Sequence, residues 1–164
     1  MKKINNLILS FFLIIYVVGC ANYEPIFKSK NLPIVISDYT IEGNKLLSNK
    51  IYSLLNNLLK KNISNNDTKK IDLMIHVTKN KSISSKDNNG KILEYTVSIN
   101  AKIKVNNTMN DNEILNQNFQ ASAAFKAQDQ YSDTLKLERK KEGDLINKIY
   151  QNFLIKLTEK TVSK

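Results

Sequence analysis

The longest run of strict alternation in the chain extends from Leu93 to Val105. Every second residue is apolar, including the small Ala101, and the residues between them are polar or charged. Because successive side chains of a strand point to opposite faces, this run predicts a long strand with one dry face and one wet face. Shorter alternating runs at 71–77 and 115–125 flank it, and the chain turns between them. Asn89-Gly90 lies in the first of these turns, and Asn-Gly is a strong hairpin signal. We therefore expect an antiparallel meander of three strands.

Two other segments have helical spacing. Apolar residues three and four apart predict one helix from Lys45 to about Asn62 and another from Leu135 to Lys160. Before the first helix, the β-branched and aromatic residues between Leu32 and Ile41 predict one more strand. The expected fold class is therefore α+β, with two layers. A four-stranded, mostly antiparallel sheet would carry two amphipathic helices packed on one face.

The amino end has the order of a lipoprotein signal peptide. Lys2 and Lys3 precede an apolar run from Leu7 to Val18, and Gly19 and Cys20 follow. The run is shorter than the roughly 20 residues that a permanent transmembrane helix needs. We expect residues 1–19 to be the signal peptide, 20–31 a lipidated tether and 32–164 a single α+β domain. The alternative is an ordinary secretory signal with an incidental cysteine.

Cys20 is the only cysteine of the chain, so no disulfide can form within it. The fold must then be held by its core alone, and the remaining stretch of about 145 residues suffices for one domain. Cys20 is the predicted lipidation site. Ala21 follows it in place of aspartate, which is typical of sorting to the outer membrane.

The chain is basic, with 25 Lys and Arg residues against 15 Asp and Glu. This balance favours anionic partners such as phosphates or acidic lipids, although lysine and asparagine are also what an AT-rich genome encodes by default. Export disfavours nucleic acid as a partner. The cations form two candidate anion-binding patches, one around the hairpin turn and one near the start of the last helix. They consist of Lys79, Lys81, Lys86 and Lys91, and of Lys136, Arg139, Lys140 and Lys141.

The sequence offers few groups for catalysis. His76 is the only histidine, and the alternation places it with Asp72 on the polar face of the second strand. One histidine without a cysteine partner makes a poor metal site, because zinc usually takes three or four protein ligands. The glycines are too scattered for a phosphate-binding loop. We expect no enzyme activity, no metal and no cofactor; a periplasmic enzyme that uses His76 and Asp72 is the rival interpretation.

A family resemblance joins several of these features. The lipobox at Cys20, the strand and helix, the hairpin at Asn89-Gly90, the alternating stretch Glu94–Ala101 and the closing helix together resemble the LPS-assembly lipoprotein family, LptE. The resemblance spans nearly all of the mature chain. It implies an outer-membrane lipoprotein that faces the periplasm and plugs the lumen of an LptD-type β-barrel protein. The pair would take part in lipopolysaccharide transport and insertion at the cell surface.

The resemblance also implies a ligand site. Family members contact the phosphorylated sugar of lipopolysaccharide through basic residues near the hairpin turn and near the start of the last helix. In this chain the corresponding candidates are Lys86, Lys91, Lys136, Arg139 and Lys140. The alternative function is a free-standing outer-membrane lipoprotein that binds another anionic ligand.

Overall fold

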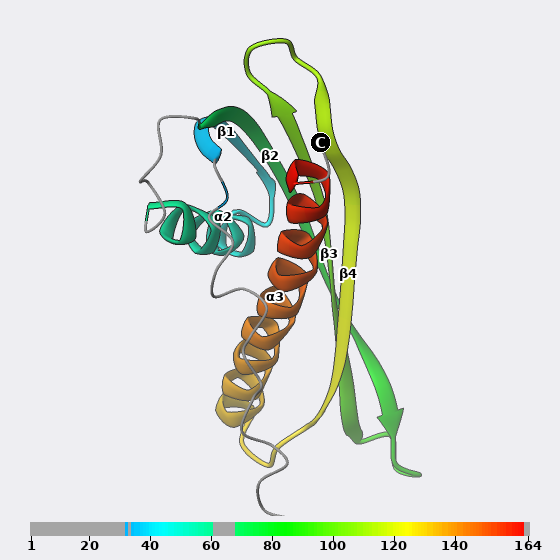
Figure 1. Ribbon diagram of the computed structural model, residues 1–164. Helices are drawn as coiled ribbons and strands as arrows, with labels where there is room; N and C mark the ends of the chain where they lie inside the picture. The colour runs from blue at the N-terminus through cyan, green and yellow to red at the C-terminus, as the bar shows by residue number, and fades with distance from the viewer. Residues whose placement is uncertain (1–31, 33, 61–67, 163–164) are drawn as a thin grey trace, which may run out of the picture. The chain divides into compact units, whose positions relative to one another are not determined.

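The computed structural model describes residues 32, 34–60 and 68–162. The predicted signal peptide, the tether and Cys20 fall outside the described residues. Figure 1 shows the order of the elements. These are β1 (Ile34–Gly43), α2 (Lys45–Lys60), β2 (Lys69–Lys86), β3 (Ile92–Asn107), β4 (Glu113–Lys126) and α3 (Tyr131–Val162).

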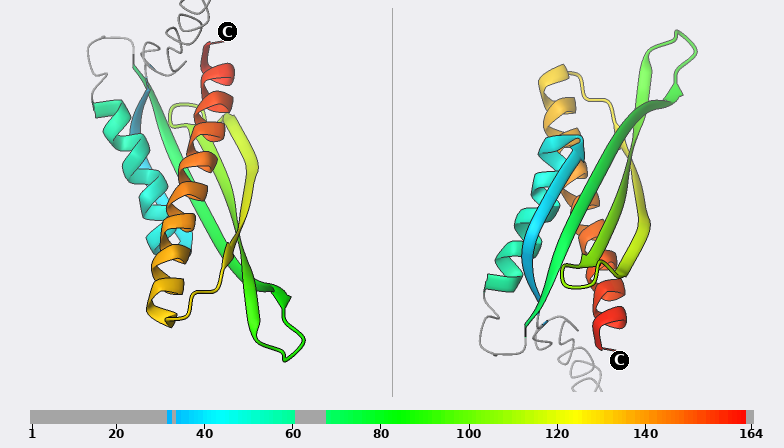
Figure 2. Two further views of the ribbon diagram at one scale, coloured as in Figure 1. Left: turned by 90° about the horizontal axis from the view of Figure 1, so that it is seen from below. Right: turned by 90° about the horizontal axis from the view of Figure 1, so that it is seen from above.

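The four strands form one sheet in the order β1-β2-β3-β4. β1 runs parallel to β2, and the other two neighbouring pairs are antiparallel. Both helices lie on the same face of this sheet, as the two views of Figure 2 show. α2 packs against β1 and β2, whereas α3 packs against β3 and β4. The predicted two-layer α+β fold is confirmed.

The apolar positions of the alternating runs form the core between the two layers. In the sheet, Ile75 pairs with Ile103 and Val77 with Ala101, and all four are fully buried. The helices contribute the other half of the core through residues that are also fully buried: Ile51, Leu55, Ile146, Ile149 and Phe153. Since each large aliphatic or aromatic side chain contributes about 1.5–3 kcal/mol on burial, this layer supplies most of the stabilisation.

The β2–β3 hairpin turns where Asn-Gly predicts, through a three-residue loop. The amide of Asp87 donates to the carbonyl of Lys91 (2.9 Å), so these two residues close the loop. The carboxylate of Asp87 accepts from the amides of Asn89 (2.9 Å) and Lys91 (2.8 Å). Gly90 adopts a φ of +82°, the left-handed conformation that the last residue of such a loop requires.

α3 begins at Tyr131, about one turn before the predicted start at Leu135. The apolar stripe does not reach this turn, which is held by polar contacts instead. The amide of Gln128 donates to the buried hydroxyl of Thr134 (2.8 Å), and Asp133 provides a negative charge at the positive end of the helix dipole. The basic residues from Lys136 onward therefore lie within the first turns of the helix.

Gly43 links β1 to α2 in a conformation that only glycine tolerates. Its φ is +69°, and an added Cβ would lie 2.2 Å from the carbonyl oxygen of Val77. The amide of Asn44 donates to this same oxygen (2.7 Å), and the side chain of Asn44 accepts from the amide of Leu47 (3.2 Å) to cap α2. This close approach ties the start of α2 to β2.

Replacing Gly43 by alanine should therefore destabilise the domain strongly. We expect Gly43→Ala to lower the free energy of unfolding by at least about 2 kcal/mol, because the left-handed backbone and the clash with Val77 both oppose a side chain. Gly90→Ala is the matched control, since Gly90 has a similar φ but open space around it; it should cost only about 1 kcal/mol. Urea denaturation followed by circular dichroism measures both, and equal losses would contradict the role of the Val77 contact.

Candidate anion-binding site

The β2–β3 hairpin extends beyond the rest of the sheet. The ladder between β3 and β4 ends at the pair Glu94 and Lys126, whereas β2 and β3 remain paired as far as Lys86 and Ile92. Lys86 and Lys91 are both exposed on either side of the turn. In Figure 1 this hairpin projects at the lower right.

The start of α3 lies at the same end of the sheet as this hairpin (Figure 2). The amide of Ala127 donates to the carbonyl of Leu93 (2.9 Å), so the chain leaves β4 beside the base of the hairpin and then enters α3. Arg139 and Lys140 are exposed on the helix, as is Lys136, which donates to the carboxylate of Asp133 (2.8 Å). The structure therefore brings both predicted basic patches to one end of the sheet, on two separate projections.

Lys79 and Lys81 behave differently from the other cations of the hairpin. They continue the side of β2 that faces the helices, and they meet two glutamates of α3. Lys79 donates to Glu138 (3.2 Å) and Glu142 (2.7 Å), and Lys81 donates to Glu138 (2.6 Å). We call these four residues the inner charge cluster. Its two lysines are neutralised within the domain, so the predicted patch at the hairpin is reduced to Lys86 and Lys91.

The inner charge cluster is held in its charged state by its own contacts. Burial by itself would raise the pKa of Glu138, but hydrogen bonds from Lys81 and Lys79 outweigh this effect and lower its pKa. The hydrogen bond to Glu142 raises the pKa of Lys79. Lys81 also lies over the ring of Tyr95, with 4.3 Å between its Nζ and the ring centroid. The cluster thus joins the hairpin to α3 where the aliphatic core ends.

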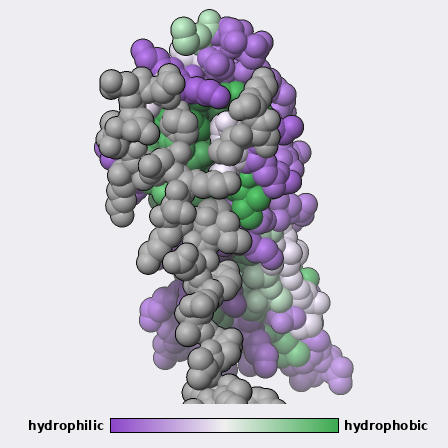
Figure 3. All heavy atoms as spheres, viewed as in Figure 1, coloured by the Kyte–Doolittle hydropathy of each residue, from purple (hydrophilic) through white to green (hydrophobic). Residues whose placement is uncertain are grey.

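The remaining cations at this end have no ionic partner among the described residues, and exposed apolar side chains lie on the same hairpin as two of them. Within the described part of the chain, no ion pair involves Lys86, Lys91, Arg139 or Lys140. Ile83 and Leu93 on the hairpin are 47% and 45% exposed. Figure 3 shows hydrophobic side chains among hydrophilic ones at this end. Ammonium and guanidinium groups bind phosphate, and the apolar neighbours suit the hydrocarbon part of an amphiphile.

The face of the sheet that carries no helix is the second candidate surface. Its cross-strand rows are mainly uncharged and polar, and we call it the open face. One row consists of Thr78, Asn100 and Gln120, and the next consists of Asn80, Ser98 and Ser122. No described element covers these rows.

His76 and Asp72 lie on the open face, as the alternation predicts. Nδ1 of His76 is 3.3 Å from a carboxylate oxygen of Glu42, and Asp72 accepts from the hydroxyl of Thr108 (2.9 Å). Among the described residues, no three metal-ligating side chains form a group. No helix among them is long and apolar enough to cross a membrane.

The sequence is matched by no protein-family model and by no protein of curated function. Several solved structures are similar to it in fold, among them two bacterial lipoproteins. Rare lipoprotein B from Shewanella oneidensis is 12% identical with a TM-score of 0.53, and the match covers 77% of this chain and 99% of that one. A minor lipoprotein from Acinetobacter baumannii is 10% identical with a TM-score of 0.55, covering 80% and 92%. The chain shares its fold with these two lipoproteins.

The inner charge cluster should stabilise the domain in a pH-dependent way. Glu138 is only 8% exposed, and Glu138→Gln would remove the charge that both lysines contact. We expect a loss of about 2 kcal/mol at pH 7. A carboxylate with a lowered pKa adds stability above its unfolded-state pKa and loses this contribution as the pH falls through its folded-state pKa. The difference between the variant and the wild type should therefore shrink below about pH 4.3.

Glu159→Gln is the matched control for this experiment. It removes the same charge from the same helix, but the pair of Glu159 with Lys156 (2.9 Å) is half exposed. Its loss should be below about 1 kcal/mol at any pH. Thermal or urea unfolding at several pH values measures both variants. If Glu138→Gln loses as little stability as the control, or if its loss does not change with pH, the inner charge cluster does not stabilise the domain as described.

Proposed function

We propose that this protein is an outer-membrane lipoprotein that plugs an LptD-type β-barrel and takes part in lipopolysaccharide transport and insertion at the cell surface. The observation that carries the proposal is the open face. The two helices cover only one side of the sheet, and the other side presents long rows of Ser, Thr, Asn and Gln side chains.

The open face is suited to a polar wall. The lumen of an outer-membrane barrel is lined by polar side chains, which alternate with the lipid-facing ones along each strand. Polar groups tolerate burial when hydrogen-bonding partners meet them, and hydroxyl and amide groups can both donate and accept. The two middle rows of the open face, which start at Thr78 and at Asn80, carry no charged side chain that burial would leave unpaired.

The basic end is suited to a phosphorylated amphiphile. Lys86 and Lys91 flank the hairpin turn, and Arg139 and Lys140 extend from α3 at the same end of the sheet. The exposed Ile83 and Leu93 lie on the same hairpin as the first two cations. Lipopolysaccharide combines phosphates with hydrocarbon, so it matches both kinds of side chain.

The proposed outer-membrane location rests on the sequence at the amino end. The lipobox at Cys20, followed by Ala21, supports lipidation and placement in the outer membrane. The fold shared with two bacterial lipoproteins agrees with a lipid-anchored location. Within the proposal the protein has no catalytic role, and His76 and Asp72 serve only as polar residues of the open face.

Purification from membranes tests the plug proposal. We expect the tagged full chain, extracted from outer membranes, to bring down a large β-barrel protein that mass spectrometry identifies. Asn100→Glu places a charge in the middle of the open face and should reduce the recovered barrel about tenfold, because the charge would be buried without a partner. Asn57→Glu, an exposed position on α2, is the control for the added charge.

The alternative function makes a different prediction for this purification. A free-standing outer-membrane lipoprotein that binds another anionic ligand would be recovered from the membrane without a barrel. That result, obtained with the wild-type chain, would overturn the plug proposal.

Charge reversal tests the ligand. We expect Lys86→Glu with Lys91→Glu, and separately Arg139→Glu with Lys140→Glu, to weaken binding to purified lipopolysaccharide about tenfold, because charge-assisted contacts to phosphate are lost. Lys102→Glu with Lys148→Glu introduces the same change in charge at exposed positions outside this end. Binding is measured by fluorescence titration, and circular dichroism checks the fold. Unchanged affinity in both test pairs would remove the basis for a lipopolysaccharide site here.

A further inference from the structure

β4 is an edge strand whose outer side pairs with no strand among the described residues. Exposed edges attract other strands, and proteins usually protect them with charges, prolines, bulges or short strands. Residues 114–125 of β4 carry no charged side chain and no proline. The opposite edge differs in charge, because β1 carries Asp38 and Glu42 within its length; each edge strand has one register shift, between Ile36 and Asp38 in β1 and near Glu113 in β4. One edge of this sheet is protected, and the other is open.

The ladder to β3 shows which backbone groups of β4 remain unpaired. The amide of Ala127 donates to Leu93, which marks the odd-numbered residues of β4 as the ones bonded to β3. In an antiparallel pair, bonded and non-bonded positions alternate. The amides and carbonyls of Asn118, Gln120 and Ser122 therefore point to the outer edge.

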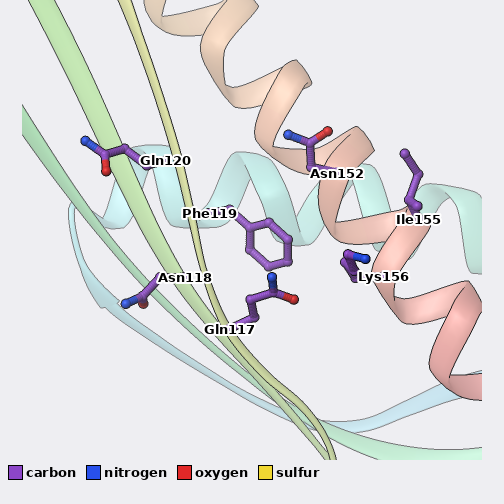
Figure 4. Close-up of a pocket in the computed structure, with 7 residues that line it drawn as sticks. All are labelled: Gln117, Asn118, Phe119, Gln120, Asn152, Ile155 and Lys156. Carbon is purple, nitrogen blue, oxygen red and sulfur yellow. The ribbon is translucent and has the colours of Figure 1, made fainter.

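A groove lies beside this edge on the helix side. It has a volume of about 310 Å³ and is lined by Gln117 and Phe119 of β4 and by Asn152, Ile155 and Lys156 of α3. Figure 4 shows the ring of Phe119 directed toward α3, whereas Asn118 and Gln120 point away from the helix. Ile155 is 41% exposed at its wall. A strand added to the edge would place every second side chain over this groove, and an aliphatic or amide side chain would fit it.

We infer that the outer edge of β4 receives an extended, uncharged strand of the partner protein, which continues the sheet. This inference rests on the proposed function, in which the partner is the barrel protein. Main-chain hydrogen bonds to Asn118, Gln120 and Ser122 supply affinity, and the groove selects the alternate side chains. A second copy of this chain is disfavoured, because without Lys2 and Lys3 of the predicted signal peptide each chain still has 23 Lys and Arg residues against 15 Asp and Glu, and two such chains would repel one another.

Backbone hydrogen exchange in the purified complex tests the inference with an internal control. In the free protein, the outward amides of Asn118, Gln120 and Ser122 should exchange rapidly, whereas those of Phe119 and Ala121 are protected by β3. In the complex with the barrel, the three outward amides should become protected as well. Residue-resolved mass spectrometry or NMR measures both states. Outward amides that stay unprotected in the complex would overturn the inference.

Ser122→Pro tests the same edge by removing one outward donor while leaving the ladder to β3 intact. Ser122→Ala is the matched control, because it loses the same hydroxyl but keeps the amide. We expect Ser122→Pro to recover about fivefold less barrel with the tagged full chain than Ser122→Ala does, the equivalent of one net hydrogen bond, because Ser122→Ala already includes any effect of losing the hydroxyl from the open face. Circular dichroism checks that each variant folds. If Ser122→Pro does not fold, the hydrogen-exchange experiment on the wild type still tests the added strand.

The outcomes separate this inference from the proposed function. If Ser122→Ala and Ser122→Pro bring down the barrel equally, only the added strand is overturned and the plug proposal survives. If the wild type brings down no barrel, both fall. Protection of the outward amides in the isolated protein, together with a doubled mass in sedimentation, would assign the edge to a second copy and overturn the inference.

Discussion

The packing of two helices against the aliphatic face of β2 and β3 is the interaction on which the rest of the structure depends. Rows such as Ile75 with Ile103 meet Ile51, Ile149 and Phe153 across the layer. Because both helices are required on this face to bury it, none remains for the other. The polar character of the open face follows directly, and so does the availability of that face for a partner.

The charges of the domain are sorted by the same arrangement. Where the aliphatic part of β2 ends after Val77, its helix-facing side continues with Lys79 and Lys81, and α3 presents Glu138 and Glu142 to them. The helical repeat then turns Arg139 and Lys140 outward. One short stretch of α3 thus neutralises the inner lysines and displays outer cations, so positive charge without a described ionic partner remains on the surface of this end of the domain.

The open face and the outer edge of β4 are two parts of one surface. The open face offers side chains, whereas the edge offers backbone groups; the two middle rows of the open face and residues 114–125 of the edge strand carry no charge. A partner with a polar wall and an extended strand would engage both. The basic end lies apart from this surface at the tip of the hairpin and the start of α3, so the two proposed binding surfaces use different residues.

The sequence by itself determined the elements and the faces. Alternation at Leu93–Val105 and the helical stripes suffice for the α+β fold, and Asn89-Gly90 suffices for the hairpin, because local periodicity reports which side chains avoid water. It also placed His76 and Asp72 on the polar face. The first turn of α3 was missed, because Thr134 and Asp133 hold it through polar contacts that carry no apolar period.

Only the tertiary structure decided how the cations are used. In sequence, Lys79 and Lys81 look like Lys86 and Lys91, although their place in the alternation after Val77 signals the helix-facing side. Their partners on α3 are more than fifty residues away, and no local pattern shows that these groups meet. Which strand lies at the edge is likewise a property of the sheet order, because an edge is defined by the neighbour that a strand lacks.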